Sequence, residues 1–211
     1  GAFKSVADFF HRVDPAAEEL EAMIRAGACD EFGDTRTRQF WQAQHLVKTF
    51  SSNAEPNQGW LIAPPGLEQL VSVPLAEPTR QEKLQAETDL FGYAVSGHPL
   101  ELFPDVAWES YCPVNRLGEF VGETVTTCGL VVEQRTHHQI TGEPMKFLSL
   151  GDWTGIVETE LFAQTYKSYG LATVRYPVLE VEAQVEAFEN ARGFSLRVLR
   201  AGSPRARSIA V

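Results

Sequence analysis

Basic and aromatic residues recur near one another in the second half of the chain. In proteins that bind single-stranded nucleic acid, aromatic rings stack on bases at roughly 1–3 kcal/mol per base, while Arg and Lys hold the phosphates. This combination of residue types therefore predicts contacts to a single strand. The candidate binding residues are Arg135, His137, His138, Lys146, Phe147, Trp153, Phe188, Arg192, Phe194 and Arg197.

These residues need a scaffold, and the sequence from Val125 onward predicts one made of strands. Apolar and polar residues alternate, most strictly over 178–188, and short turns separate the segments. Three strands, a short helix over 163–170 and two further strands are the order of the five-stranded OB-fold barrel. That fold binds through strands two and three and through the loops joining strands one to two and four to five. The expected strands are 125–136, 145–152, 155–162, 178–188 and 194–200.

The strand aromatics have a second interpretation. Alternation places half of every strand inside a barrel. Phe147 and Phe194, each taken alone, are therefore expected to fill the core rather than to bind. The basic residues of the loops are the stronger candidates.

Neither a catalytic site nor a metal site is predicted. Cys29, Cys112 and Cys128 lack CxxC spacing, which argues against structural zinc and against a disulfide framework. Reduced thiols fit a cytoplasmic protein. His137 and His138 are neighbours in a strand, so their rings face opposite ways and do not share a metal. GxSxG, P-loop, HExxH and dinucleotide-binding motifs are missing, and we expect no cofactor and no catalytic residue.

The formal net charge of -10 is unevenly distributed. Residues 1–116 hold 9 Lys and Arg against 17 Asp and Glu, whereas residues 117–211 hold 9 against 11, giving -8 and -2. Phosphate neutralisation supplies most of the affinity for nucleic acid, so this balance predicts weak or assisted binding by the barrel. No run approaches the roughly 20 apolar residues that span a bilayer, and we expect no membrane contact.

The beginning of the chain predicts helices. Ser5 with Asp8 is a capping box that opens the first helix. Asp14 as N-cap and Pro15 at the first helical position predict the start of a second helix. Gly27 suits the left-handed conformation that ends it.

Two more helices and a linker complete the first half. A third helix is expected over 35–50, and Thr79 with Glu82 is a capping box for a helix that runs through Phe91. The segment between them is rich in Pro, Gly, Ser and Asn without a period, which is typical of a linker. The predicted class is α+β: a small N-terminal helical module followed by a five-stranded OB-fold β-barrel. The expected divisions are a helical module at 1–50, a linker at 51–78, a helical connector at 79–116, the barrel at 117–202 and a tail at 203–211.

Three segments of the chain carry a family resemblance. They read FKSVADFFHRVD followed by LEAMIRAGACDEFGDTR, then ETDLFGYAVSGHPLELF, then VTTCGLVVEQRTHHQITGEPMKFLSLGDWTGIVETELFAQTY. The SGHPL box at 96–100 and the pattern TG-x-x-M-x-F-x-x-L-x-D-x-TG at 141–155 are the most specific parts. The chain resembles the C-terminal part of the bacterial DNA polymerase III alpha subunit. Only 51–78 and the tail fall outside the resemblance.

The resemblance implies roles for both halves. In that family the helical segment belongs to a helix-hairpin-helix region that contacts duplex DNA and the sliding clamp, and the OB domain lies near the single-stranded template. The polymerase palm lies upstream. The resemblance thus implies a non-catalytic fragment of a DNA-directed DNA polymerase, a nucleotidyltransferase of DNA replication. Single-stranded DNA, the sliding clamp and other replisome subunits are the implied partners.

Some family members also carry a clamp-binding peptide between the two regions. The nearest match here lies in the linker, and the alternative is a linker strand that packs on the helices. Its candidate residues are Gln69, Leu70, Val73 and Leu75.

Two other functions stay open. The acidic charge favours a protein-interaction module that docks replisome partners and contacts DNA only incidentally. A free-standing OB enzyme or tRNA-type binder is disfavoured, because such proteins have no reason to carry the helical module and the SGHPL box. Gly97 and Pro99 in that box predict a turn, and we expect His98 to be structural, with its side chain hydrogen-bonded to the backbone between the domains.

Overall fold

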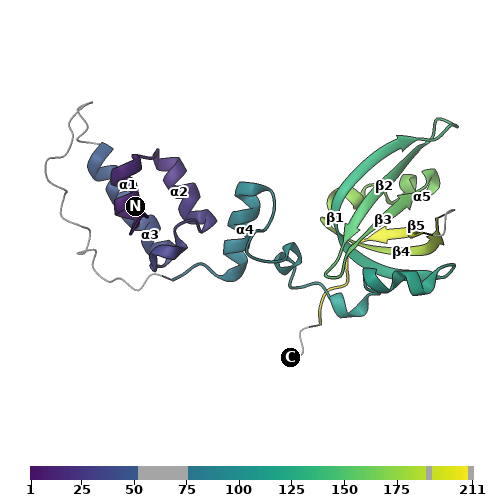
Figure 1. The fold of residues 1–211 in the computed structure, drawn as a ribbon. Helices are drawn as coiled ribbons and strands as arrows, with labels where there is room; N and C mark the ends of the chain where they lie inside the picture. The colour runs from purple at the N-terminus through teal and green to yellow at the C-terminus, as the bar shows by residue number, and fades with distance from the viewer. Residues whose placement is uncertain (52–75, 189–191, 209–211) are drawn as a thin grey trace. The chain divides into compact units, whose positions relative to one another are not determined.

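The computed structural model describes residues 1–51, 76–188 and 192–208. It divides into two compact units, Gly1–Leu102 and Phe103–Val211. The division falls inside the segment 79–116 that the sequence suggests as one connector. Figure 1 shows a first unit made of helices and a second built around a barrel. None of the described helices combines the length and apolar character needed to cross a membrane.

The first unit packs helices around a small core. Its elements are α1 (Val6–Val13), α2 (Ala17–Ala26), η1 (Asp30–Phe32), α3 (Arg36–Ser51), α4 (Arg80–Phe91) and η2 (Pro99–Leu102). Apolar residues three or four apart give α1, α2 and α3 an inward stripe. The buried cluster of α1, α2 and α3 consists of Val6, Phe9, Phe10, Leu20, Ile24, Cys29, Ala43 and Leu46.

Three predicted helix ends are confirmed. The Ser5 hydroxyl accepts the Asp8 N–H at 3.1 Å and caps α1, but the Asp8 carboxylate accepts the Lys4 N–H rather than that of Ser5, so the predicted capping box is only half formed. Thr79 and Glu82 form the reciprocal capping box of α4. Gly27 ends α2 at φ 85°. Each of these signals involves residues close together in the sequence, so the sequence alone is sufficient to place the helix ends.

The predicted role of Asp14 is wrong. Asp14 ends α1 in the left-handed conformation, at φ 51°, and α2 begins at Ala17. Pro15 disfavours the right-handed helical conformation in the residue before it, and Asp is one of the few residues that tolerate the left-handed region. The Glu19 carboxylate accepts the Ala16 N–H in place of an N-cap side chain.

A buried carboxylate holds the loop that follows α4. Glu87 is buried, and its Oε2 accepts the N–H groups of Val95 at 2.9 Å and Ser96 at 2.8 Å. Two loop donors that would lack partners are thereby satisfied. The loop folds back along its own helix as a result.

A second carboxylate fixes the SGHPL box. Glu101 pairs with the Arg80 guanidinium, with Nη2 and Oε1 3.0 Å apart, and also accepts the His98 N–H. His98 Nδ1 accepts the Leu100 N–H at 3.2 Å. The box is therefore a turn attached to α4, which agrees with the structural role expected for His98.

The second unit is a closed barrel with the strand order β1-β2-β3-β5-β4. All neighbours pair antiparallel except β3 and β5, which are parallel. A helical segment between the third and fourth strands completes the OB-fold and confirms the predicted α+β class. The elements are η3 (Trp108–Ser110), η4 (Val114–Phe120), β1 (Thr124–His138), β2 (Pro144–Gly151), β3 (Ile156–Leu161), α5 (Ala163–Tyr169), α6 (Ala172–Arg175), β4 (Val178–Ala187) and β5 (Phe194–Gly202).

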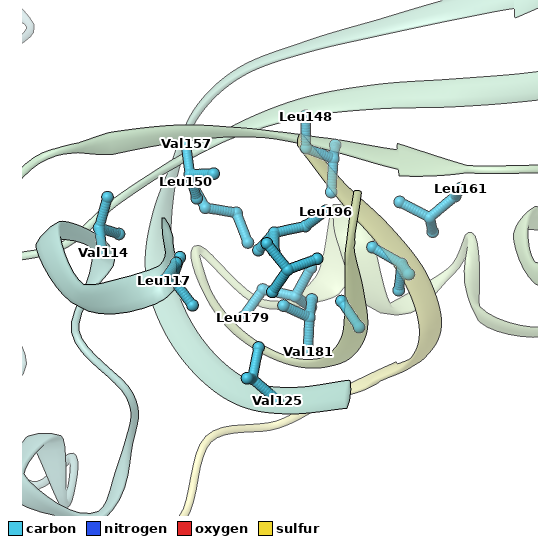
Figure 2. Close-up of a cluster of buried hydrophobic side chains, with 13 residues drawn as sticks. Val114, Leu117, Val125, Leu148, Leu150, Val157, Leu161, Leu179, Val181 and Leu196 are labelled. Atoms are coloured by element: carbon cyan, nitrogen blue, oxygen red, sulfur yellow. The ribbon is translucent and has the colours of Figure 1, made fainter. Parts of the chain in front are cut away.

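The barrel core is apolar and draws on every strand (Figure 2). Alternate residues of the strands point inward, and η4 adds Val114 and Leu117 to them. The buried cluster is Val114, Leu117, Val125, Leu148, Leu150, Val157, Leu161, Leu179, Val181, Ala183, Val185, Leu196 and Val198.

The chain after β5 is attached to the barrel unit. Ala206 forms an isolated bridge with Val106. The Tyr111 hydroxyl donates to Glu180 at 2.6 Å and accepts the Arg205 N–H at 2.6 Å. This part of the predicted tail is therefore hydrogen-bonded in place.

Candidate nucleic-acid interface

One row of residues crosses the outward face of the barrel. Strand pairing sets Arg135 of β1 opposite Phe147 of β2, Phe147 opposite Glu160 of β3, and Glu160 opposite Arg197 of β5. Residues that face each other across strands lie on the same side of a sheet. At about 4.8 Å per strand, the two arginines are about 14 Å apart along the sheet. We call these four residues the outer row; three of them are predicted binding residues.

The Arg135 end of the outer row carries a second ring. His137 packs edge-on against Phe147, with ring centroids 6.2 Å apart. Arg135 Nε lies 3.5 Å from Glu133 Oε1, and both side chains are well exposed. A guanidinium in such an exposed pair is readily drawn to a phosphate, because surface ion pairs contribute only about 0–1 kcal/mol.

The Arg197 end includes an aromatic residue that sequence reasoning missed. The Arg197 guanidinium lies 5.0 Å from the Phe162 ring centroid and 3.5 Å from the Glu186 carboxylate. Phe162 follows β3 directly, two residues after Glu160. The outward alternation of this strand is the signal that could have revealed it.

Carboxylates interrupt this face. Glu160 stands between Phe147 and Arg197 and accepts a hydrogen bond from Ser195 at 3.2 Å. In the neighbouring row, Ser149 donates to Glu158 at 2.8 Å. The face therefore offers rings for stacking within a field of mixed charge.

The predicted role of Lys146 is corrected. Alternation along β2 directs Lys146 inward, where it is 5% exposed. Its Nζ donates to the Thr173 hydroxyl at 2.8 Å and lies 5.8 Å from the Tyr166 ring centroid. Loss of solvation lowers the pKa of the ammonium. Lys146 thus joins the helical segment to β2 and presents no charge to a ligand.

The β1–β2 hairpin forms an exposed arm. The last seven residues of β1, ending at His138, are exposed, and Figure 1 shows the hairpin extending from the barrel. The turn closes through the Gln139 N–H to the Glu143 carbonyl, with Gly142 at φ 82°. His138 lies opposite Pro144 near this tip, outside the outer row.

The residues around the β4–β5 connection differ in accessibility. Phe188 is exposed, and its N–H donates to the Gly193 carbonyl at 2.9 Å. Arg192 is exposed as well. Phe194, in contrast, packs on the barrel core and lies over Gly118. Its predicted role as a binding residue gives way to the alternative of core packing.

Trp153 lies away from the outer row. It occupies the turn after β2, where Asp152 Oδ1 accepts the Thr154 and Gly155 N–H groups. Six positions along an extended chain separate it from Phe147, or about 20 Å. Its ring packs edge-on against Trp108, with centroids 6.3 Å apart. The structure therefore brings Trp153 to a different part of the barrel unit.

The three cysteines are packed side chains with weakly reactive thiols. Burial raises the pKa of the Cys29, Cys112 and Cys128 thiols, for Cys128 to about 12. A thiol with a raised pKa holds little thiolate, the reactive form. Within residues 1–51, 76–188 and 192–208, no group of three His, Cys, Asp or Glu side chains could hold a metal ion. The predicted clamp-binding residues Gln69, Leu70, Val73 and Leu75 lie outside the described residues.

Comparison with known proteins gives matches in both units. The helix-hairpin-helix motif family matches residues 1–39. The second OB-fold domain of replication protein A from Methanococcus maripaludis matches the chain's fold at 17% identity and a TM-score of 0.27, over 43% of this chain and 91% of that domain. That overlap is too low to carry an argument, and the assignment of the barrel rests on its strand order.

Two curated relatives cover most of the chain. The DNA polymerase III subunit alpha of Thermus aquaticus is 31% identical over 94% of the chain, and the error-prone DNA polymerase of Symbiobacterium thermophilum is 29% identical over 81%. The chain spans only 17% of the length of each of them. The chain therefore belongs to the bacterial DNA polymerase III alpha subunit family and corresponds to a C-terminal part of its members.

Proposed function

We propose that the barrel unit binds single-stranded DNA during DNA replication, as a non-catalytic part of a cytoplasmic DNA polymerase III alpha subunit. The observation that carries the proposal is the outer row. It places two guanidinium groups and an aromatic ring on one outward face, with Phe162 beside Arg197. The names of the relatives supply the context of a DNA polymerase.

Each side chain has a defined part in this binding. Phe147 and Phe162 offer ring faces or edges to unstacked bases, and Arg135 and Arg197 attract the phosphates on either side. Glu160 opposes the phosphates, which keeps the affinity of the isolated chain low. His138 near the β1–β2 tip, and Phe188 and Arg192 at the β4–β5 connection, belong to the two loop regions that OB-folds use for binding.

Replacement of the arginines tests the proposal. Titration of a labelled oligothymidylate, followed by fluorescence anisotropy at several salt concentrations, gives a plot of log affinity against log salt. Each lost phosphate contact reduces its slope by about 0.7. We expect this for Arg135→Ala and for Arg197→Ala, and twice as much for the double variant.

Two matched controls sharpen this titration. Arg116 is exposed and paired with Glu119 outside the outer row, so Arg116→Ala leaves the slope unchanged. Lys146→Met also leaves it unchanged, because the ammonium is buried. Equal slopes for the wild type and the double arginine variant would refute binding by this face.

Glu160→Gln tests the same face in the opposite direction. The amide keeps an acceptor for Ser195 but removes the negative charge between Phe147 and Arg197. We expect the oligothymidylate to bind several-fold more tightly at low salt, with the gain shrinking as salt screens the charge. Unchanged or weaker binding would contradict a phosphate path across the row.

For the helical unit, we propose contacts to duplex DNA and to the sliding clamp. The match of residues 1–39 to the helix-hairpin-helix motif supports the first. The second rests on the linker residues Gln69 to Leu75, and other replisome subunits remain proposed partners. Pull-down of the clamp by the chain and by its Leu75→Ala variant tests this part, and equal recovery would exclude the peptide as a clamp site.

A second candidate function is the docking of replisome proteins with incidental DNA contact. The specific observation in its favour is that Arg135 and Arg197 each have a carboxylate within 3.5 Å. Two results together would favour this function. The wild type would bind no measurable oligothymidylate, and the double arginine variant would still bind replisome subunits.

A further inference from the structure

The helical segment between β3 and β4 carries an exposed stripe that the proposed DNA interface does not use. Gly170 and Leu171 have right-handed helical dihedrals, so α5 continues into α6 almost without interruption. Lys167, Leu171, Val174 and Arg175 therefore follow at i, i+4, i+7 and i+8, on one face. Leu171 is 78% exposed and Val174 is 70% exposed. We call these four residues the α5–α6 stripe.

The opposite side of this segment is anchored. Tyr166, Ala172 and Tyr176 pack on the barrel core. Thr173 is buried and accepts the hydrogen bond of Lys146. The α5–α6 stripe is consequently held on a rigid support and faces away from the core, so exposure of its aliphatic side chains is not the result of a loosely attached helix.

The charges of the stripe differ from those elsewhere on the barrel unit. Six arginines of this unit have a carboxylate within ion-pair distance: Arg116, Arg135, Arg197, Arg200, Arg205 and Arg207. Of the carboxylates that the structure describes, none lies within that distance of Lys167 or Arg175. The Arg175 guanidinium lies 5.5 Å from the ring centroid of Tyr176. Although the chain has a net charge of -10, the side chains of Lys167 and Arg175 can therefore pair with carboxylates of another molecule.

We propose that the α5–α6 stripe binds an acidic peptide segment of a partner protein. Lys167 and Arg175 are eight residues apart, or about 12 Å along a helix. An extended peptide covers that distance in about four residues. The ligand is therefore a segment with two carboxylates four residues apart and an aliphatic side chain midway between them, on the same face of the extended peptide, which covers Leu171 and Val174.

The side chains of the stripe distinguish a peptide from a nucleic acid. Single strands are recognised by rings on which bases stack, and the stripe has two aliphatic side chains in that place. Burial of aliphatic surface against aliphatic surface is the contact that a peptide supplies. This second surface does not depend on the outer row.

The test uses the full chain and a labelled peptide of sequence Gly-Asp-Ala-Leu-Ala-Asp-Gly, followed by fluorescence anisotropy. We expect saturable binding that weakens roughly tenfold or more in Leu171→Ser/Val174→Ser, from the loss of two apolar contacts. We expect a similar loss in Lys167→Glu/Arg175→Glu. Because all four side chains are exposed, circular dichroism should show an unchanged fold.

Matched controls separate the stripe from general effects. Ile156 is 64% exposed on β3, and Ile156→Ser leaves peptide binding unchanged. Arg116→Glu/Arg200→Glu changes the net charge as much as the double charge variant does, yet retains the peptide. The proposal is overturned if the wild type does not bind the peptide. It is also overturned if a stripe variant and its control lose the same amount of peptide affinity. A stripe variant that loses oligothymidylate instead of peptide also overturns it, and makes the stripe a nucleic-acid surface.

Discussion

The two units differ in the polar side chains that they bury. In the barrel, the closed strand ladder pairs the backbone groups, and the core is aliphatic with one buried charged side chain, Lys146, among the described residues. The helical unit buries the side chains of Arg36, Gln39 and Glu87: Gln39 and Glu87 bond to the backbone of connecting segments, and Arg36 donates to the Arg25 carbonyl in the last turn of α2. The barrel thus buries little charge, and the helical unit holds its helices and connections with buried charged and amide side chains.

The hairpin between α2 and α3 illustrates the second case. Gln39 Nε2 donates to the Cys29 carbonyl at 2.7 Å, and Arg36 Nη1 donates to the Arg25 carbonyl at 3.0 Å. Arg36 also pairs with Asp30 at 2.7 Å, and that hydrogen bond raises the pKa of the guanidinium. All of these residues lie in the segment that matches the helix-hairpin-helix motif. Side chains therefore shape the connection between α2 and α3 within the matched motif.

The largest expected effect is on packing in the barrel. Leu179→Ala removes a fully buried side chain from a closed barrel that has little freedom to collapse, and we expect a loss of about 3–5 kcal/mol. Leu20→Ala in the helical unit should cost less, about 2–3 kcal/mol, because helices can shift toward a cavity. Hydrogen exchange read by mass spectrometry on peptides of each unit gives the two values. A larger loss for Leu20→Ala would reverse the comparison.

The next largest effect concerns the buried carboxylate of Glu87 in the helical unit. Glu87→Ala leaves the Val95 and Ser96 N–H groups without their acceptor, and we expect a local loss of about 1–3 kcal/mol. Glu87→Gln keeps an acceptor oxygen at the same position and should recover part of the lost stability. Exchange of the Val95 and Ser96 amides measures this directly. Equal exchange in the wild type and both variants would show that packing alone holds the loop.

The elements of both units were predictable from the sequence because their signals are local. Strand alternation and capping boxes involve residues a few positions apart, and they place the barrel strands and the starts of α1 and α4 within a few residues. The role of Asp14 was missed because two local signals compete there. Its chemistry suits an N-cap, but the proline after it favours the left-handed end of α1.

The candidate site was only partly predictable, because it depends on which strands become neighbours. Arg135, Phe147 and Arg197 were identified by type, but their common row follows from pairings between distant segments. Lys146 was misplaced since its charge suggested the surface, while its partner Thr173 is 27 residues away in the sequence. Phe162, which follows the last residue of β3, was not predicted as a binding residue.

The smallest expected effect concerns acid. The Arg80 hydrogen bond, with help from the His98 N–H, lowers the pKa of Glu101 from 4.5 to about 2. Because the folded-state pKa lies below the unfolded one, the contribution to stability is complete above about pH 4.5 and is lost as the pH falls toward 2. The carboxyl is at the surface, so solvent screening keeps this contribution small. The SGHPL turn of the helical unit should loosen in that window while the apolar barrel core stays closed.

Nuclear magnetic resonance can follow this change at the Glu101 side chain and the His98 amide during an acid titration. We expect Arg80→Ala to bring the pKa of Glu101 back toward 4.5 and to move the His98 amide signal at a higher pH than in the wild type. Arg116→Ala is the matched control, because Arg116 pairs with Glu119 in the other unit. A Glu101 pKa that does not respond to Arg80→Ala would mean that the backbone donor of His98 alone sets it. The turn would then depend on its own backbone rather than on a side chain of α4, and the comparison between the units would weaken.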